Sequence, residues 1–154
     1  MSSNGRSPGF TALLDRYPDD DVTVIVLSNS YATVSQDPIG PALAAIVFGE
    51  QPEKQPVFTA VKVPEATLNS YAGQYQYGPD YFVPNAKFTL TVDGGALLME
   101  LGSFRTPLSP LSSTEFLERN FLGRVVFTVG AGRKVEGLTY KYSGKDFVAR
   151  REAK

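Results

Sequence analysis

From residue 64 onward, short runs of strand-forming residues alternate with turn signals, and this regular pattern limits the fold more than any other feature of the chain. Asp93-Gly94, placed between two apolar runs, is typical of a tight β-hairpin. Gly102, Gly123 and Gly144 mark further reversals. Strands that recur about every ten residues with such turns between them predict an antiparallel sandwich or barrel.

Eight strands are predicted in this part of the chain, and they favour a closed antiparallel barrel. Their expected ranges are 73–77, 87–92, 96–101, 105–108, 115–118, 124–129, 136–142 and 146–151. Residues 65–70 precede them as a short helical turn. An eight-stranded barrel has room inside for packed side chains or for one small ligand. The alternating Phe, Leu and Val residues favour a filled interior.

The first fifty residues follow a different pattern, a β-hairpin and then a helix. Strands are predicted over 9–14 and 22–27, with the turn at 17–21, and residues 5–9 are interpreted as a Gly/Pro turn that leads into the hairpin. The second strand consists almost entirely of β-branched residues. Such a run is typical of a strand that is covered on both faces.

A helix is expected after the hairpin, with a start at Asp37 or Gly40 and a stop at Gly49. Its large apolar residues recur at helical spacing, so this face is expected to pack against the sheet. They are Ile39, Leu43, Ile46 and Val47. The fold class predicted for the whole chain is mainly β (α+β overall), with a hairpin-and-helix domain over 1–49, a proline-containing linker over 50–63 and the antiparallel barrel over 64–154.

Charge and composition exclude several classes of function. The 154 residues carry a net charge of −1 and no basic cluster, which argues against nucleic-acid binding. Without cysteine and histidine the chain lacks disulfides, the commonest metal ligands and the usual general base, so no metal site and no cofactor is predicted. No apolar run is long enough for a membrane span, and no signal peptide is recognised, so the localisation stays open.

One short motif matches a catalytic pattern, but its surroundings do not. Gly5-Arg6-Ser7-Pro8-Gly9 has the spacing G-x-S-x-G, which in a nucleophile elbow requires a strand before the serine, a helix after it and a histidine base. Here a strand is expected after the serine, and no histidine exists. The chain also lacks S-x-x-K, the spacing that places a lysine beside a nucleophilic serine, and Y-x-N. We therefore predict no catalytic residue and no enzymatic activity for this chain.

Three segments that follow one another match a known stretch in order. They are GRSPGF at 5–10, LLDRYPDDD at 13–21 and VIVLSN at 24–29. This run resembles the end of the catalytic domain in serine β-lactamase-like hydrolases, the group that includes class C β-lactamases, penicillin-binding proteins and related esterases. In that family an H-x-G or K-T-G triplet stands on the strand beside the nucleophile. The triplet falls here on Ser3, Asn4 and Gly5, of which only Gly5 fits, so the position is interpreted as vestigial.

The second half of the chain also has a counterpart. The segment LNSYAGQY at 68–75 resembles the L-x-x-Y-x-G-x-Y opening of lipocalin-like domains that are appended to many of these hydrolases. The resemblance implies an accessory barrel that serves oligomerisation or shapes access to the active site. It also implies that the nucleophile, its lysine and the tyrosine motif belong to a part of the family fold that lies upstream. Members of the family are often periplasmic or secreted.

Two further groups of residues bear on a binding site. Tyr77, Tyr81 and Phe82 flank a Gly-Pro-Asp loop and are predicted to line a barrel mouth, where a small apolar ligand could bind. Four glutamates on predicted strands are expected to point outward, because charged side chains on a barrel do so by default. They are Glu100, Glu115, Glu118 and Glu136.

The sequence thus predicts a non-catalytic C-terminal fragment or accessory module of a β-lactamase-like serine hydrolase. We expect a homo-oligomer that forms through the N-terminal sheet, because the strand over 22–27 would otherwise leave apolar surface and free edges exposed. The alternative is a barrel that binds a small hydrophobic ligand.

Overall fold

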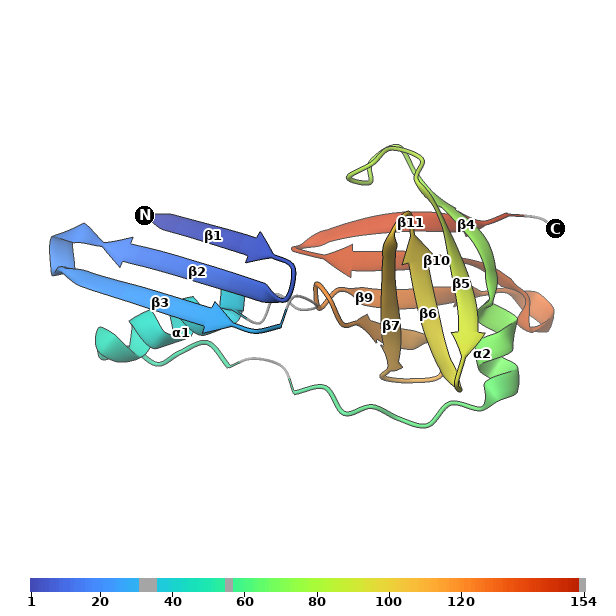
Figure 1. Cartoon of the computed structure of the whole chain (residues 1–154). Coiled ribbons are helices and arrows are strands. Elements are labelled where there is room, and N and C mark those ends of the chain that lie inside the picture. Colours follow the sequence, from blue (N-terminus) through green and yellow to red (C-terminus); the bar gives the residue numbers. More distant parts are fainter. Residues whose placement is uncertain (31–35, 55–56, 153–154) are drawn as a thin grey trace. The chain divides into compact units, whose positions relative to one another are not determined.

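The computed structural model describes residues 1–30, 36–54 and 57–152. The chain forms two compact units, Met1–Val57 and Phe58–Lys154, and the point of division falls inside the segment predicted as a linker, 50–63. Each unit has its own sheet and its own helix (Figure 1).

The first unit is built on a three-stranded antiparallel sheet in the order β1-β2-β3. Its strands are β1 (Ser2–Ser7), β2 (Phe10–Tyr17) and β3 (Val22–Ser28), with a short 3-10 turn at Pro18–Asp20. The prediction of a turn over 5–9 was wrong for its first part, because Gly5, Arg6 and Ser7 pair with β2. Only Pro8 and Gly9 turn, with Gly9 at φ 88°, a conformation that glycine adopts without strain.

One face of this sheet is covered by α1 (Gln36–Val47), but not through the helix face that the sequence predicted. The buried positions of α1 are Gln36, Gly40 and Ala44. The predicted face is exposed instead, with Ile46 and Val47 each 60% accessible. Small side chains let the helix approach the strands closely, and a Cβ at position 40 would collide with the Leu13 side chain. Steric fit, not hydrophobicity, therefore sets the orientation of α1.

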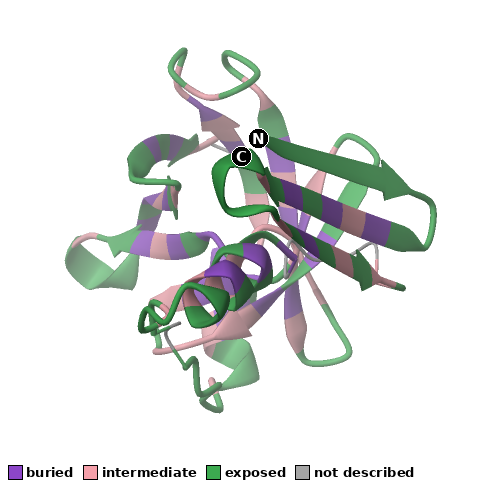
Figure 2. Cartoon of the chain, turned by 90° about the vertical axis from the view of Figure 1, so that its left-hand side faces the viewer, coloured by how far each residue is buried: buried purple, intermediate pink, exposed green. Residues whose placement is uncertain are grey.

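The other face of the sheet is open. Burial alternates along β2 while β1 is exposed throughout (Figure 2). The residues of β2 and β3 that point away from α1 include Phe10, Leu14, Ile25 and Leu27, which are between 42% and 78% exposed. The expectation that the strand over 22–27 is covered on both faces is therefore wrong for this chain. We call these four side chains the open face.

The second unit is a closed eight-stranded antiparallel barrel, as predicted. Each strand pairs with its neighbour in sequence, and β11 closes the barrel against β4. The strands are β4 (Gly73–Tyr77), β5 (Lys87–Asp93), β6 (Ala96–Leu101), β7 (Phe104–Pro110), β8 (Glu115–Glu118), β9 (Arg124–Val129), β10 (Val135–Tyr142) and β11 (Lys145–Arg151). A 3-10 turn at Ala131–Arg133 links β9 to β10. The predicted ranges agree with these bounds for four strands; β5, β10 and β11 are each one residue longer than predicted, and β7 is three residues longer.

The two ends of the barrel differ. Helix α2 (Glu65–Tyr71) lies at one end and contributes Leu68 and Tyr71 to the core (Figure 1). The Tyr71 ring stacks on Phe127 with centroids 3.8 Å apart, and its hydroxyl donates a hydrogen bond to the backbone oxygen of Ser113 at 2.7 Å. Fully buried side chains such as Tyr75 and Phe116 fill the adjoining interior, as the sequence predicted. The opposite end carries the loops after β4, β6, β8 and β10.

Candidate functional site

The residues at the family triplet position lie on β1. Ser3, Asn4 and Gly5 are all exposed there, and β1 pairs with β2 alone among the described residues. A strand is where the resemblance expects this triplet. The side chains it requires, histidine or lysine at the first position, are replaced by that of Ser3.

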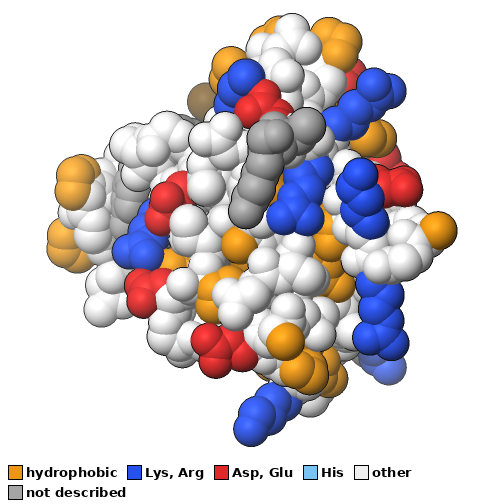
Figure 3. All heavy atoms as spheres, turned by 90° about the vertical axis from the view of Figure 1, so that its right-hand side faces the viewer, with side chains coloured by type: hydrophobic (Ala, Val, Ile, Leu, Met, Phe, Trp, Pro, Cys, Tyr) orange, Lys and Arg blue, Asp and Glu red, His pale blue; other side chains and the backbone are white. Residues whose placement is uncertain are grey.

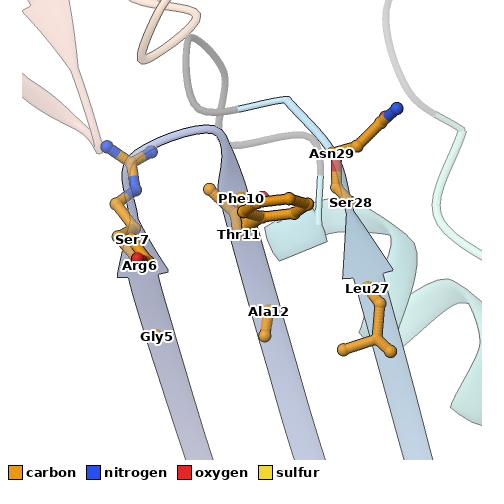
Figure 4. Close-up of a pocket in the computed structure, with 9 residues that line it drawn as sticks. All are labelled: Gly5, Arg6, Ser7, Phe10, Thr11, Ala12, Leu27, Ser28 and Asn29. Atoms are coloured by element: carbon orange, nitrogen blue, oxygen red, sulfur yellow. The ribbon is translucent and has the colours of Figure 1, made fainter.

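A groove of about 700 Å³ lies at one end of the three-stranded sheet, between the turn of the first hairpin and the end of β3 (Figure 4). It is lined by Gly5, Arg6, Ser7, Phe10, Thr11, Ala12, Leu27, Ser28 and Asn29. Arg6 is the one titratable group in this lining, and a guanidinium does not release its proton near neutral pH. The Ser7 hydroxyl therefore has no general base among the lining residues. Ser7 is also followed by a hairpin and β2, not by the helix of a nucleophile elbow.

The second candidate site is a cavity of about 370 Å³ at the end of the barrel opposite α2. All three residues predicted for a barrel mouth, Tyr77, Tyr81 and Phe82, contribute to its wall. Most of the remaining lining is apolar or aromatic and comes from β6, β7 and β10 and from the loops beside them. It consists of Met99, Leu101, Phe104, Thr106, Glu118, Asn120, Phe121, Tyr140 and Tyr142.

Stacked rings hold the predicted residues in place. The Tyr77 and Tyr81 rings are nearly parallel, at an angle of 6° and with centroids 3.7 Å apart. Phe147 on β11 meets Tyr81 edge-on at 5.4 Å and lies 4.9 Å from the Phe82 ring. Pairs of this kind stabilise by about 0.5–1.5 kcal/mol beyond their buried area. The loop between β4 and β5 is thereby fixed over the cavity by aromatic contacts.

Glu118 is the charged group of the cavity, and its position corrects an expectation. It was expected to point outward, but it is 2% exposed and shares the inner face of β8 with Phe116. Its Oε1 accepts hydrogen bonds from the Thr106 hydroxyl and the Asn120 N–H, both at 2.7 Å. Its Oε2 accepts one from the Phe121 N–H at 2.9 Å and a longer one from the Tyr140 hydroxyl at 3.4 Å. The carboxylate thus ties the turn after β8 to the barrel interior.

The pKa values of two tyrosines in the cavity wall are raised. Burial raises the pKa of Tyr77 well above its ordinary value, and the neighbouring Tyr81 and Tyr140 add to the effect. Burial likewise raises the pKa of Tyr140, with the Glu118 charge as the second cause. The Tyr77 hydroxyl is fully buried, and it donates a loose hydrogen bond toward the Tyr81 hydroxyl, which raises the pKa of Tyr77 and opposes the rise at Tyr81. No described residue donates a hydrogen bond to the Tyr77 oxygen, so its acceptor capacity stays open.

Glu118 is the functional candidate that sequence reasoning missed. One signal was available, since Phe116 and Glu118 are two residues apart on one strand and must therefore point to the same side. The donors that satisfy the carboxylate come from β7, β10 and the following turn, and no local pattern reveals them. Asn120, Phe121 and Thr106 were missed for the same reason.

The remaining surface offers less chemistry. On the face drawn in Figure 3, Lys and Arg side chains lie among Asp and Glu side chains. Among the described residues no three acidic side chains converge in a way that could hold a metal ion. Neither described helix is long and apolar enough to cross a membrane.

Fold and site together define a small β-barrel protein with an aromatic cavity and a separate three-stranded sheet unit. No protein-family model matches the sequence. A distant similarity links the chain to penicillin-binding protein 4* of Bacillus subtilis (strain 168), which is 26% identical over 155 residues. This match covers 97% of the chain but 33% of the relative, so the chain spans about a third of that protein's length.

Solved structures with low similarity include SurE with D-Leu, at 18% identity and a TM-score of 0.44, covering 97% of this chain and 34% of that one. The octameric penicillin-binding protein homologue from Pyrococcus abyssi has 23% identity and a TM-score of 0.30, with 97% and 33% covered. TM-scores this low support no structural inference. The sequence match alone therefore supports a loose relationship to penicillin-binding proteins.

Proposed function

We propose that this chain is a non-catalytic C-terminal portion and accessory module of a β-lactamase-like serine hydrolase, and that it associates with itself through its N-terminal sheet. The distant similarity to penicillin-binding protein 4* supports the relationship. The absence of histidine, of S-x-x-K and of Y-x-N from the sequence supports the non-catalytic role.

The observation that carries the proposal is the incomplete cover of the three-stranded sheet. Phe10, Leu14, Ile25 and Leu27 expose a continuous apolar face on one side, and the α1 residues Ile39, Leu43, Ile46 and Val47 expose a second apolar surface on the other. Exposed contiguous apolar surface of this kind marks a site of protein contact. A second copy of the chain offers the same open face, so an isologous contact would bury the open faces of the two copies against each other.

The catalytic part of the proposal is tested with a chromogenic β-lactam and a short-chain p-nitrophenyl ester, followed by intact mass spectrometry of the protein. We expect no turnover above the protein-free control and no covalent adduct. The matched control is Ser7→Ala, which removes the one serine in the G-x-S-x-G spacing. Turnover and an adduct in the native chain that both vanish in Ser7→Ala would make Ser7 a nucleophile and overturn the proposal.

A second candidate function, binding of a small and largely apolar ligand by the barrel, is favoured by the cavity opposite α2. Its volume of about 370 Å³ lies at the lower end of the range of about 300–1,000 Å³ found for ligand sites. The predicted mouth residues Tyr77, Tyr81 and Phe82 belong to its wall. Titration with benzyl alcohol and with benzylammonium, followed by chemical-shift changes, tests this function. Saturable shifts confined to the cavity are expected for at least one of them, and their absence with both would exclude it.

A further inference from the structure

We propose that the barrel cavity selects a small organic cation, an ammonium group on a compact apolar body, and that the buried carboxylate of Glu118 is its charge-recognition group. The inference rests on the ligand-binding function proposed for the barrel and names the chemistry of the ligand. It does not depend on the hydrolase relationship.

The first argument is an uncompensated negative charge. Glu118 is 2% exposed, and every hydrogen bond it accepts comes from a neutral donor: two backbone N–H groups and two hydroxyls. Glu118 belongs to none of the ion pairs that the described barrel residues form with one another, and no basic residue lines the cavity. Buried carboxylates are normally paired with a cation. A cationic ligand would supply the missing positive charge.

The second argument is the room left at the carboxylate. Three of its hydrogen bonds are between 2.7 and 2.9 Å long, whereas the one from the Tyr140 hydroxyl to Oε2 is 3.4 Å. A bond of that length is weak. Oε2 can therefore accept a short, charge-assisted hydrogen bond from an ammonium group without losing the contacts that hold the turn after β8.

The third argument is independent of Glu118. The Tyr77 hydroxyl is buried and belongs to the cavity wall, and while it donates toward Tyr81, no described residue donates a hydrogen bond to it. A phenol oxygen accepts a hydrogen bond as well as donating one, so an ammonium N–H would satisfy it. The cavity thus holds two groups that a cationic ligand can contact, a negative charge and an open acceptor.

The aromatic wall suits the same ligand. Phe82 at the rim is 63% exposed and meets Tyr142 edge-on with centroids 6.1 Å apart, and Phe104 is 51% exposed. The faces of aromatic rings attract cations by about 0.5–2 kcal/mol, more when water is excluded. A carboxylate ligand would instead be repelled by Glu118 at short range, and a neutral alcohol would leave the charge uncompensated.

The test compares three probes of similar shape on the full chain: benzylammonium, benzyl alcohol and phenylacetate. Isothermal titration calorimetry gives their affinities, and chemical-shift changes locate the bound probe. We expect benzylammonium to bind at least about tenfold more tightly than benzyl alcohol, with phenylacetate weakest. Equal affinity for ammonium and alcohol would overturn the charge selection while leaving a binding cavity. Failure of all three probes to bind would overturn the ligand-binding function itself.

Two variants assign the effect to Glu118. Glu118→Gln keeps an acceptor for the turn but removes the charge, and it is expected to abolish the preference for benzylammonium. Glu136→Gln makes the same chemical change at an exposed position of β10 and is expected to leave the preference unchanged. A folded Glu118→Gln variant that still prefers the ammonium would overturn the assignment. If that variant fails to fold, Tyr77→Phe, which removes the second ammonium contact, must weaken benzylammonium binding more than benzyl alcohol binding.

Discussion

The two units of this chain differ in how completely they bury their apolar surface. In the barrel every strand has two neighbours, and seventeen buried residues form one core. In the N-terminal unit Leu13, Val24 and Ala44 are the buried apolar residues, and β1 and β3 are edge strands among the described residues. Closure removes the need for a partner, whereas an open sheet with one covered face creates it.

The two units also differ in the functional groups that they present. The groove of the N-terminal unit offers a serine without a base, although the family resemblance points there. The barrel offers a buried carboxylate and a tyrosine hydroxyl with an open acceptor inside an aromatic cavity. The unit with the stronger core is therefore also the one with the better-defined site, because packing is what fixes side chains in a cavity.

The largest effect is expected from emptying the barrel core. Phe116→Ala removes a fully buried ring and should lower the free energy of unfolding by about 3–5 kcal/mol. Leu13→Ala in the N-terminal unit should leave the unfolding transition of the barrel where it is. Urea unfolding followed by tyrosine fluorescence measures both. A shift of the barrel transition by Leu13→Ala as large as that by Phe116→Ala would show that the two units do not differ in self-sufficiency.

Alkaline pH should destabilise the barrel, because its buried tyrosines ionise more easily in the unfolded chain. Burial raises the pKa of Tyr75 from 10.0 to about 12, and the pKa values of Tyr71, Tyr77, Tyr81 and Tyr140 are raised as well. A folded pKa above the unfolded one means stability that is complete below pH 10 and is lost as the pH rises through about 12. Tyr75 alone accounts for up to about 3 kcal/mol.

The measurement is tyrosinate absorbance against pH, together with circular dichroism. Ionisation of the barrel tyrosines should coincide with unfolding. Complete titration near pH 10 with the fold intact would contradict the burial of these hydroxyls.

A smaller effect is expected where α1 meets the sheet. Gly40→Ala places a Cβ against the Leu13 side chain and 3.1 Å from Asp15 Oδ2, so it should destabilise the N-terminal unit by about 1–3 kcal/mol. Gly5→Ala is the matched control, because a Cβ there meets nothing within 4 Å. Hydrogen exchange of the full chain should show faster exchange in α1 for Gly40→Ala alone. Unchanged protection of α1 would mean that its contact with the sheet is looser than described.

The smallest effect on stability, with a clear effect on association, is expected from Leu27→Glu on the open face. Leu27 is 78% exposed, so the folding free energy should change by less than about 0.5 kcal/mol. Self-association should weaken because the charge must be desolvated in any contact. Val148→Glu, at a 55% exposed position on the barrel, is the control. Light scattering over micromolar concentrations measures the oligomeric state of each variant. A native chain that stays monomeric throughout would refute the proposed association.

Local chemistry explains which parts of the fold could be predicted. The barrel strands were predicted nearly residue by residue because turn residues such as Asp93-Gly94 act within a few positions. The strand β1 was missed because Ser3, Asn4 and Gly5 have little strand preference and pair only because β2 lies beside them. The face of α1 was predicted wrongly because hydrophobic spacing does not reveal how closely Gly40 must approach Leu13.

The residues of the candidate site also fall into two groups, those that the sequence could indicate and those that only the fold revealed. Tyr77, Tyr81 and Phe82 line the cavity, and the sequence could single them out because they stand beside a turn at the end of a strand; their contact with a ligand stays a prediction. By itself, the sequence determined the order and spacing of the strands, the absence of a histidine or thiol catalyst, and the turn residues that let a meander close. Tertiary structure alone decided that Glu118 points inward to donors from three parts of the chain, that the Tyr77 hydroxyl is buried at the cavity, and that one face of the small sheet stays open. The physical reason is that turns and strand propensities act between neighbours in sequence, whereas burial and hydrogen-bond satisfaction depend on residues that only folding brings together.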